Sequence, residues 1–180
     1  AYDTTRISVG GSSAGGNMAL SLSARLGSER IKSCFALYPA AHLTHPERLD
    51  TVMGCVSDKF RSGVVIPHWC MKLFINAYTT PGTDMNDPRL SPMFYDASKF
   101  PKYVAVACGD ADTLYRMSFD LMKKISGSAS GTNVDGSRKF ICVLNEAHEF
   151  NTFGRTRASQ EERDRVEGEA INMIRASWRQ

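Results

Sequence analysis

Three residues of this 180-residue chain have the types needed to cleave an acyl bond together: Ser13, Asp112 and His148. A serine hydroxyl is a weak nucleophile at neutral pH, so it needs an imidazole to accept its proton and a carboxylate to orient that imidazole. These residues occur in the chain in the order Ser, Asp, His. That order is the one used by α/β enzymes in which the serine sits on a sharp turn between a strand and a helix.

Ser13 lies at the centre of the pentapeptide GSSAG, residues 11–15, which has the form GxSxG. The apolar run 7–9 precedes it and a helical pattern follows from Gly16, so we predict a tight strand-to-helix turn with the serine at its apex. We expect the positions two before and two after the serine to need glycine or a similarly small residue in this turn. The helix N-terminus would add unpaired N–H groups and partial positive charge beside the serine oxygen. The alternative is a glycine-rich turn without catalytic function.

Asp112 and His148 each follow a short apolar run that has the character of a buried strand. Because the carboxyl ends of parallel strands meet at one edge of an open sheet, we expect both residues to approach Ser13. Asp110 is a rival for the role of the acid, but it lies only one residue beyond its strand. Asp112 could instead cap a helix that begins near Thr113, and His148 could be a solvated loop histidine.

Four brief apolar runs alternate with segments of helical period. The runs predict buried parallel strands at residues 7–9, 34–38, 103–108 and 140–144. Apolar stripes predict helices that pack on the sheet, at Met18, Leu22 and Leu26, at Leu114, Met117, Leu121 and Ile125, and at Val166, Ala170, Ile171, Ile174 and Trp178. Ser159 and Glu162 have the spacing of a capping box for the last helix. This order predicts an α/β fold with a parallel sheet covered on both faces, a three-layer α/β/α sandwich.

Residues 45–95 interrupt the alternation. They contain one helix signal, which starts near Pro67 and carries the apolar residues Ile66, Trp69, Cys70, Leu73, Phe74 and Ala77. Two interpretations stay open: this insertion forms a cap over a pocket, or its helix packs at the periphery of the sheet.

Composition excludes several classes of protein. The net charge of +3 is small and the basic residues are scattered, which argues against a nucleic-acid partner. No apolar run approaches the ~18 residues of a membrane span. The five cysteines have no metal-ligand spacing and are interpreted as free buried thiols, and the pair His42 and His45 lacks further ligands, so we expect no metal and no cofactor. No secretory signal opens the chain, which favours the cytoplasm, while the compartment and the oligomeric state stay unassigned.

Four segments together resemble the hormone-sensitive lipase type of carboxylesterase, the α/β-hydrolase fold-3 family. RISVGGSSAGGNMA, residues 6–19, is similar to the family's GDSAGGN stretch around the nucleophile. DPRLSP at 87–92 resembles DPxxSP, GDADTL at 109–114 resembles the acid-bearing GxxDxL, and AHEF at 147–150 resembles HGF. The resemblance covers nearly the whole chain in the same order, and departs from the family at Ser12, where Asp is usual, and at Glu149, where Gly is usual.

The resemblance implies a serine hydrolase that acts on small carboxylic esters, with Ser13 as nucleophile, Asp112 as orienting acid and His148 as general base. It also implies that the N–H of Ala14 is one oxyanion donor and that residues 45–95 contribute to a cap and an acyl pocket. Ile66, Trp69 and Phe74 are the candidate lining residues, although core packing is the commoner role of such side chains.

An expected motif is missing. The family carries an HGG or HGGG oxyanion loop well before the nucleophile, and this chain contains no such sequence. We therefore expect residues 1–180 to be a partial catalytic domain that holds strands 5 to 8 of the family's sheet order 1-2-4-3-5-6-7-8. The first strand would then be an unpaired edge, and the chain alone would have little or no esterase activity.

Two other functions are weighed against ester hydrolysis. The first is a binding protein on a degenerate hydrolase scaffold, as in hormone receptors of this family that lack the histidine. Because His148 is present, catalysis is preferred. The second is a peptidase of the prolyl oligopeptidase type, which shares the Ser, Asp, His order, and against which the GSSAGGN and DPRLSP segments favour the esterase.

Overall fold

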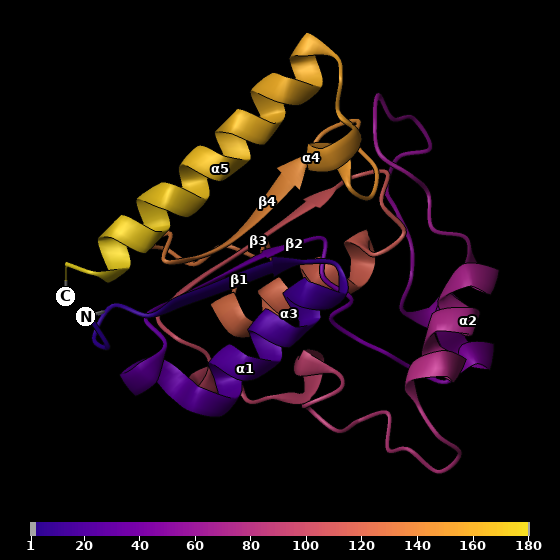
Figure 1. Ribbon diagram of the computed structural model, residues 1–180, viewed down its shortest axis with the longest axis horizontal. Coiled ribbons are helices and arrows are strands. Elements are labelled where there is room, and N and C mark those ends of the chain that lie inside the picture. The colour runs from indigo at the N-terminus through magenta and orange to yellow at the C-terminus, as the bar shows by residue number, and fades with distance from the viewer. Residues whose placement is uncertain (1–2, 180) are drawn as a thin grey trace.

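A parallel sheet of four strands forms the centre of the molecule. The computed structural model describes residues 3–179, and its strands lie in the order in which they occur in the chain, namely β1 (Ser8–Ser12), β2 (Ser33–Leu37), β3 (Tyr103–Gly109) and β4 (Arg138–Val143). One row of aligned residues crosses the sheet from Gly11 through Ala36 and Val106 to Phe140. All four predicted strands are confirmed, and β1 extends further than predicted, directly to the serine turn (Figure 1).

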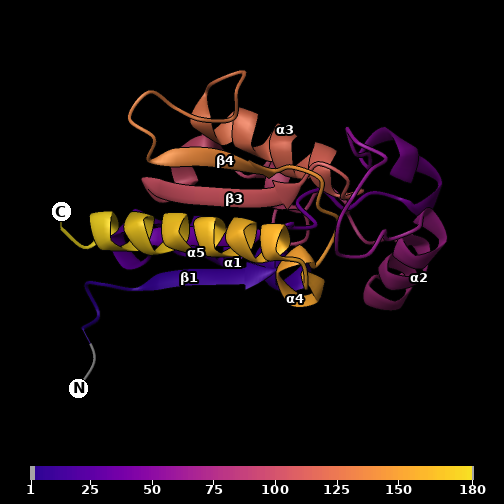
Figure 2. The same cartoon turned by 90° about the horizontal axis from the view of Figure 1, so that it is seen from above.

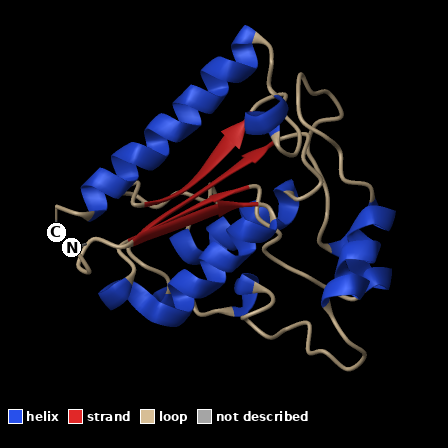
Figure 3. Ribbon diagram, viewed as in Figure 1, coloured by secondary structure: helices blue, strands red, loops and turns tan. Residues whose placement is uncertain are grey.

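Helices cover both faces of this sheet, so the predicted three-layer sandwich is confirmed (Figures 1 and 3). On one face α1 (Ala14–Arg30) packs on β1 and β2, and α3 (Tyr115–Ser126) packs on β3 and β4. On the other face α5 (Arg157–Ser177) lies along β2 and β3, with the short α4 (Phe150–Phe153) against its N-terminal end (Figure 2).

The position of β3 between two helical layers explains why its sequence is a continuous apolar run. Val104 and Val106 belong to the core beneath α1 and α3, whereas Ala105 and Ala107 belong to the core beneath α5. A parallel strand between two helical layers buries both of its faces, so a continuous apolar run takes the place of alternation.

The helical stripes are only partly correct. In α3 the predicted residues Met117, Leu121 and Ile125 are buried. In α1 the predicted stripe is wrong, because Met18, Leu22 and Leu26 are exposed, and the buried face consists of Leu20 and smaller residues such as Ala19 and Ala24. At the start of this face, a Cβ on Gly16 would be 3.1 Å from the Cβ of Pro39, which follows β2.

The start of α5 also differs from the prediction. The N-cap is Thr156, whose hydroxyl accepts a hydrogen bond of 3.1 Å from the N–H of Ser159. Ser159 is therefore the third residue of the helix and not its cap, so the proposed box of Ser159 and Glu162 is wrong. Val166 and Ala170 are buried as predicted, whereas Ile171 and Trp178 are exposed.

The long connection from β2 to β3 runs past the carboxyl ends of the strands (Figure 1). It contains the predicted helix, α2 (His68–Tyr78), and three short 3-10 helices at Pro46–Thr51, Pro92–Phe94 and Ala97–Lys99. α2 packs mainly against the first of these, away from both faces of the sheet. This position leaves the space between α2 and the sheet edge for a cavity.

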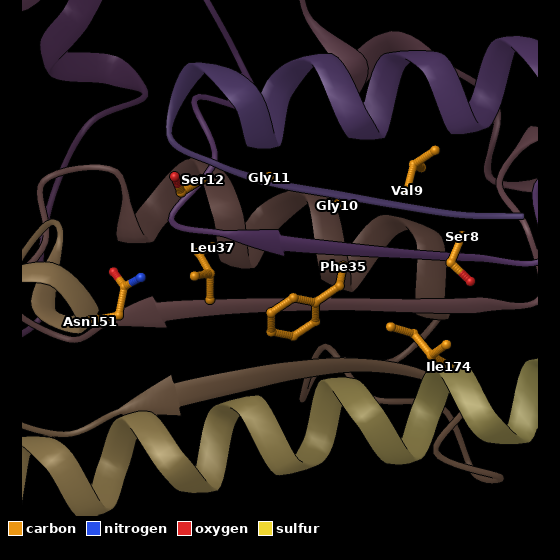
Figure 4. A pocket seen from close by; sticks show the side chains of 9 residues that line it. All are labelled: Ser8, Val9, Gly10, Gly11, Ser12, Phe35, Leu37, Asn151 and Ile174. Carbon is orange, nitrogen blue, oxygen red and sulfur yellow. The ribbon is translucent and has the colours of Figure 1, made fainter.

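Among the described residues 3–179, the strand β1 pairs with β2 only, as expected for an edge strand. A shallow groove of about 370 Å³ follows it on the α5 side, between backbone of β1 and the side chains of Phe35, Leu37, Asn151 and Ile174 (Figure 4). An exposed strand edge offers unpaired N–H and C=O groups to another chain segment.

All five cysteines are free thiols. Cys34 and Cys108 are buried as expected, but Cys55 is exposed, which corrects the expectation that all are buried. Among residues 3–179, no helix is long and apolar enough to cross a bilayer.

Candidate active site

Ser13 occupies the predicted turn between β1, which ends at Ser12, and α1, which begins at Ala14. Its backbone has φ 54° and ψ −118°, a conformation that a residue with a side chain adopts at a cost of about 1–3 kcal/mol. Two hydrogen bonds hold it there: the N–H of Ser13 donates to the carbonyl of Leu37 at 2.9 Å, and the N–H of Asn17 donates to the carbonyl of Ser13 at 3.0 Å. The strain turns the hydroxyl away from the sheet.

The two glycines of the motif are not equivalent. A Cβ on Gly11 would lie 2.5 Å from both the carbonyl carbon and the oxygen of Gly15, so no side chain fits at Gly11. A Cβ on Gly15 would meet no atom within 4 Å. The expected need for a small residue is therefore met at Gly11, whereas no steric crowding imposes it at Gly15, because only the first faces the opposite arm of the turn.

The structure brings Ser13, His148 and Asp112 into one chain of hydrogen bonds. The Nε2 atom of His148 is 3.0 Å from Oγ of Ser13, and Nδ1 of His148 is 2.8 Å from Oδ2 of Asp112. An ionised carboxylate only accepts, so the neutral imidazole that fits both contacts is the tautomer with its proton on Nδ1, in which Nε2 accepts from the serine hydroxyl. This is the arrangement in which an imidazole can remove the serine proton.

Burial makes this arrangement rigid. Asp112 is fully buried and His148 is only 3% exposed, so the alternative of a solvated loop histidine is wrong. Oδ1 of Asp112 accepts the N–H of Leu114 at 2.8 Å, which orients the carboxylate for His148. The alternative that Asp112 caps a helix is wrong, because α3 begins at Tyr115 and its N-cap position is Leu114, later than predicted.

Asp110 has a separate role. Its Oδ1 accepts the N–H of Asn145 at 2.7 Å, which ties the end of β3 to the loop that carries His148. The rival acid is therefore engaged by backbone, while Asp112 contacts the imidazole.

Tyr38 is a site residue that the sequence reasoning missed. Its ring lies against the imidazole of His148 with 4.4 Å between ring centroids, and its hydroxyl donates to Oδ1 of Asn151. Burial raises the pKa of the Tyr38 phenol to about 12, so it remains a donor at neutral pH. Its position directly after β2, at the same sheet edge as Ser13 and Asp112, was the available signal.

The loop of His148 is paired with a segment of the β2–β3 connection. The N–H of His148 donates to the carbonyl of Val64 at 3.0 Å, and the N–H of Val64 donates back to the carbonyl of His148 at 2.7 Å. Glu149 follows His148 with φ 58°, a left-handed conformation that glycine adopts most easily. This conformation is a physical reason for the glycine that the hormone-sensitive lipase type of esterase usually has at this position.

An apolar cavity of about 550 Å³ opens beside Ser13, under α2. Ile66 and Phe74 line it as predicted, whereas Trp69 is 69% exposed and is not among the lining residues, because it lies on the outward side of α2. Apart from Ser13 and Asn17 the lining is apolar, contributed by Ala14, Met18, Ala40, Leu43, Ile66, Met71, Phe74, Ile75, Ala77, Tyr78 and Leu114. A cavity of this composition suits the hydrocarbon part of a small molecule.

Ala14 is the first residue of α1, so its N–H has no acceptor within the helix. It follows Ser13 directly and adjoins the cavity, which is the position that an oxyanion donor requires.

The remaining histidines lie apart from this constellation. His42 packs edge-on against Phe94, and His45 lines a different cavity of about 260 Å³. Within the described residues 3–179, no group of three His, Cys, Asp or Glu side chains is placed to hold a metal ion.

Comparisons with known proteins identify the family and the fold. The sequence profile of the alpha/beta hydrolase fold matches residues 1–151. The structure resembles EstE1, a thermophilic carboxylesterase from a metagenomic library, with a TM-score of 0.72 and 24% identity over 98% of this chain and 56% of that one. It also resembles brefeldin A esterase, a bacterial homologue of human hormone-sensitive lipase, with a TM-score of 0.66 and 21% identity over 96% of this chain and 49% of that one.

A hyperthermophilic esterase from the archaeon Pyrobaculum calidifontis is similar too, with a TM-score of 0.68 and 19% identity over 96% of this chain and 53% of that one. The chain thus spans about half the length of these proteins. A search of curated proteins finds no match. Because the family profile covers most of the chain, and the fold is that of the solved relatives, the chain belongs to the α/β-hydrolase fold-3 family.

Proposed function

We propose that this site hydrolyses carboxylic esters through an acyl-enzyme, with Ser13 as nucleophile, His148 as general base and Asp112 as the acid that orients it. The observation that carries the proposal is the pair of contacts at His148, 3.0 Å to Ser13 and 2.8 Å to Asp112, beside an apolar cavity. The family membership and the esterases among the structural relatives support the same class of reaction.

Acylation would begin when Nε2 of His148 takes the proton of Ser13 and Oγ attacks the ester carbonyl. The buried carboxylate of Asp112 stabilises the imidazolium that forms. The carbonyl oxygen becomes an oxyanion, to which the N–H of Ala14 and the positive end of α1 offer stabilisation. Collapse of this intermediate breaks the bond to the alcohol, which leaves with the proton from Nε2.

Deacylation repeats the sequence with water. His148 removes a proton from water, the resulting hydroxide adds to the acyl carbon, and the bond to Oγ of Ser13 breaks. The proton held by His148 returns to Ser13, and the carboxylic acid is released. The apolar cavity would hold the hydrocarbon part of the ester, with Ile66 and Phe74 on its wall.

Ala14 is the one oxyanion donor that we assign among residues 3–179, and the HGG or HGGG loop that supplies further donors in the family is not in this sequence. The absence of one oxyanion donor costs about 2.7–4 kcal/mol of transition-state stabilisation. We therefore expect weak ester turnover by residues 1–180 alone, even with Ser13 activated. A non-catalytic binding protein is the second candidate, favoured by the cavity alone and opposed by the hydrogen bonds at His148.

Covalent labelling separates the two candidates. A fluorophosphonate probe reacts with a serine only when a base activates it, so we expect the folded chain to be labelled at Ser13. Ser13→Ala and His148→Ala should both abolish labelling, whereas Ser12→Ala, which changes the exposed neighbouring serine, should retain it. Absence of labelling in folded wild-type chain would reject hydrolysis and favour the binding protein.

A further inference from the structure

Glu146 is a fully buried carboxylate that lies two residues before His148 and outside the triad. Its Oε1 atom accepts hydrogen bonds from Nε of Arg61 at 3.1 Å and from Oγ of Ser159 at 2.8 Å. Its Oε2 atom accepts from the hydroxyl of Ser62. A buried charge is retained only when it is paired and hydrogen-bonded, and these three donors meet that requirement.

The donors come from two elements that are distant in the sequence. Arg61 and Ser62 belong to the β2–β3 connection, and Ser159 belongs to the first turn of α5. The guanidinium of Arg61 also donates to the carbonyl of Leu144 at 2.8 Å. The side chain of Glu146 therefore joins both elements to the loop that follows β4.

The backbone of Glu146 contacts the loop of the acid as well. Its carbonyl accepts the N–H of Ala111, the residue before Asp112, at 3.1 Å. The fit is tight, because a Cβ on Gly109 would lie 2.0 Å from that carbonyl oxygen. The acid loop and the base loop are thus fixed to each other through Glu146.

The same connection leads to the cavity wall. The N–H of Ala147 donates to the carbonyl of Ser62 at 3.0 Å, and His148 pairs with Val64 in both directions. Two residues further on, Ile66 lines the cavity, and its carbonyl accepts the hydroxyl of Thr113 at 3.1 Å. The segment 61–66 therefore runs from Glu146, past the base, to the substrate cavity.

We infer that Glu146 is a positioning residue: its buried carboxylate locks segment 61–64 and the start of α5 to the loop of His148, and so sets the distance from Nε2 to Oγ of Ser13. This inference rests on the proposed function of Ser13 and His148. A purely structural ion pair would stabilise the fold without controlling the geometry of the imidazole.

The test compares Glu146→Gln with a matched control, Glu169→Gln. Both replace an ion-paired carboxylate by an amide, but Glu169 is partly exposed and joins α5 to Lys139 near the start of β4, at the end of the strand opposite to the site. The first readout is the low-field proton NMR signal of the hydrogen between Nδ1 of His148 and Asp112, assigned by its loss in His148→Ala. The second readout is the rate of fluorophosphonate labelling per folded molecule.

We expect Glu146→Gln to shift or broaden the low-field signal and to slow labelling by about 10- to 100-fold, since a displacement near 1 Å costs ~10²-fold. Glu169→Gln should change neither readout. If Glu146→Gln does not fold, Ser62→Ala and Ser159→Ala test the inference in its place. Each of these variants removes one hydrogen-bond donor to Glu146 and leaves its carboxylate paired with Arg61. Each should give a smaller change in the same direction.

The outcomes separate the inference from the proposed function. Folded variants with the wild-type low-field signal and labelling rate would overturn the positioning role, whatever their melting temperatures. A wild-type chain that is not labelled, but whose low-field signal is lost in Glu146→Gln, would reject hydrolysis and retain the positioning of His148. A wild-type chain without the signal would overturn the inference, because Glu146 would then have no ordered contact to maintain.

Discussion

Gly11→Ala and Gly15→Ala should have opposite effects, although the two glycines are equivalent in the GxSxG motif. In Gly11→Ala the new Cβ would lie 2.5 Å from the backbone of Gly15, whereas ordinary contact begins at 3.4 Å. The turn must therefore open by almost 1 Å. Overpacking of this kind costs about 1–3 kcal/mol. For a domain of this size we expect the melting temperature to fall by about 2–12 °C.

The same opening moves Ser13, which lies between the two glycines. Its Oγ is 3.0 Å from Nε2 of His148, so a shift near 1 Å breaks that hydrogen bond. We expect the rate of fluorophosphonate labelling to fall by about 10²-fold. In Gly15→Ala the methyl group enters open space in the first turn of α1. Removal of a flexible glycine should raise stability by about 0.4–1 kcal/mol, or ~1–4 °C, and labelling should persist.

Thermal unfolding and labelling kinetics of the two variants, measured beside the wild type, give the comparison. The reasoning fails if Gly15→Ala is destabilised as much as Gly11→Ala. It also fails if Gly11→Ala melts and labels like the wild type, because the steric contact would then have no energetic weight.

Three further predictions concern the acid, the turnover and the cysteines. Asp112→Asn keeps an acceptor for the N–H of Leu114 but leaves the imidazole without its carboxylate, so labelling should slow by about 10³- to 10⁴-fold; an equal loss in Asp110→Asn would contradict the assignment of the acid. Residues 1–180 alone should hydrolyse a p-nitrophenyl ester well below the ~1–10³ s⁻¹ typical of enzymes, and turnover within that range would refute the oxyanion argument. Burial raises the pKa of the Cys34 thiol to about 12 and so suppresses its thiolate, whereas Cys55 is exposed; Cys55→Ala should remove the fastest reaction with a disulfide reagent, and a fast phase that remains would contradict this.

The sheet, and the meeting of Ser13, Asp112 and His148 at one of its edges, could be predicted because strong local signals specify them. The strands are short apolar runs bounded by turns, and parallel strands direct their carboxyl ends to one edge. Ser13, Asp112 and His148 each follow a strand, so correct strand assignments were sufficient to bring them together. The error in the end of β1, which was predicted at residue 9 and lies at Ser12, did not matter, since the serine turn still follows the strand.

The direction of helix faces could not be predicted in the same way. Met18 and Leu22 form an apolar stripe, yet both are exposed, and α1 buries the face that carries Ala19, Leu20 and Ala24. The prediction that Trp69 lines the cavity is wrong for a related reason, because the helical period does not tell which side of α2 borders the cavity. In both helices a long-range constraint overrides the local pattern.

The burial of a polar residue such as Glu146 is also difficult to predict from the sequence. In the sequence it is one acidic residue in a loop, and such residues are usually solvated. Its burial depends on donors from Arg61, Ser62 and Ser159, which only the folded chain brings together. A loop that is to hold a base in place needs more support than its own short length supplies, and hydrogen bonds to locked neighbours provide that support. The local sequence predicts the proposed reacting groups, whereas the residues that hold them become visible only from their contacts.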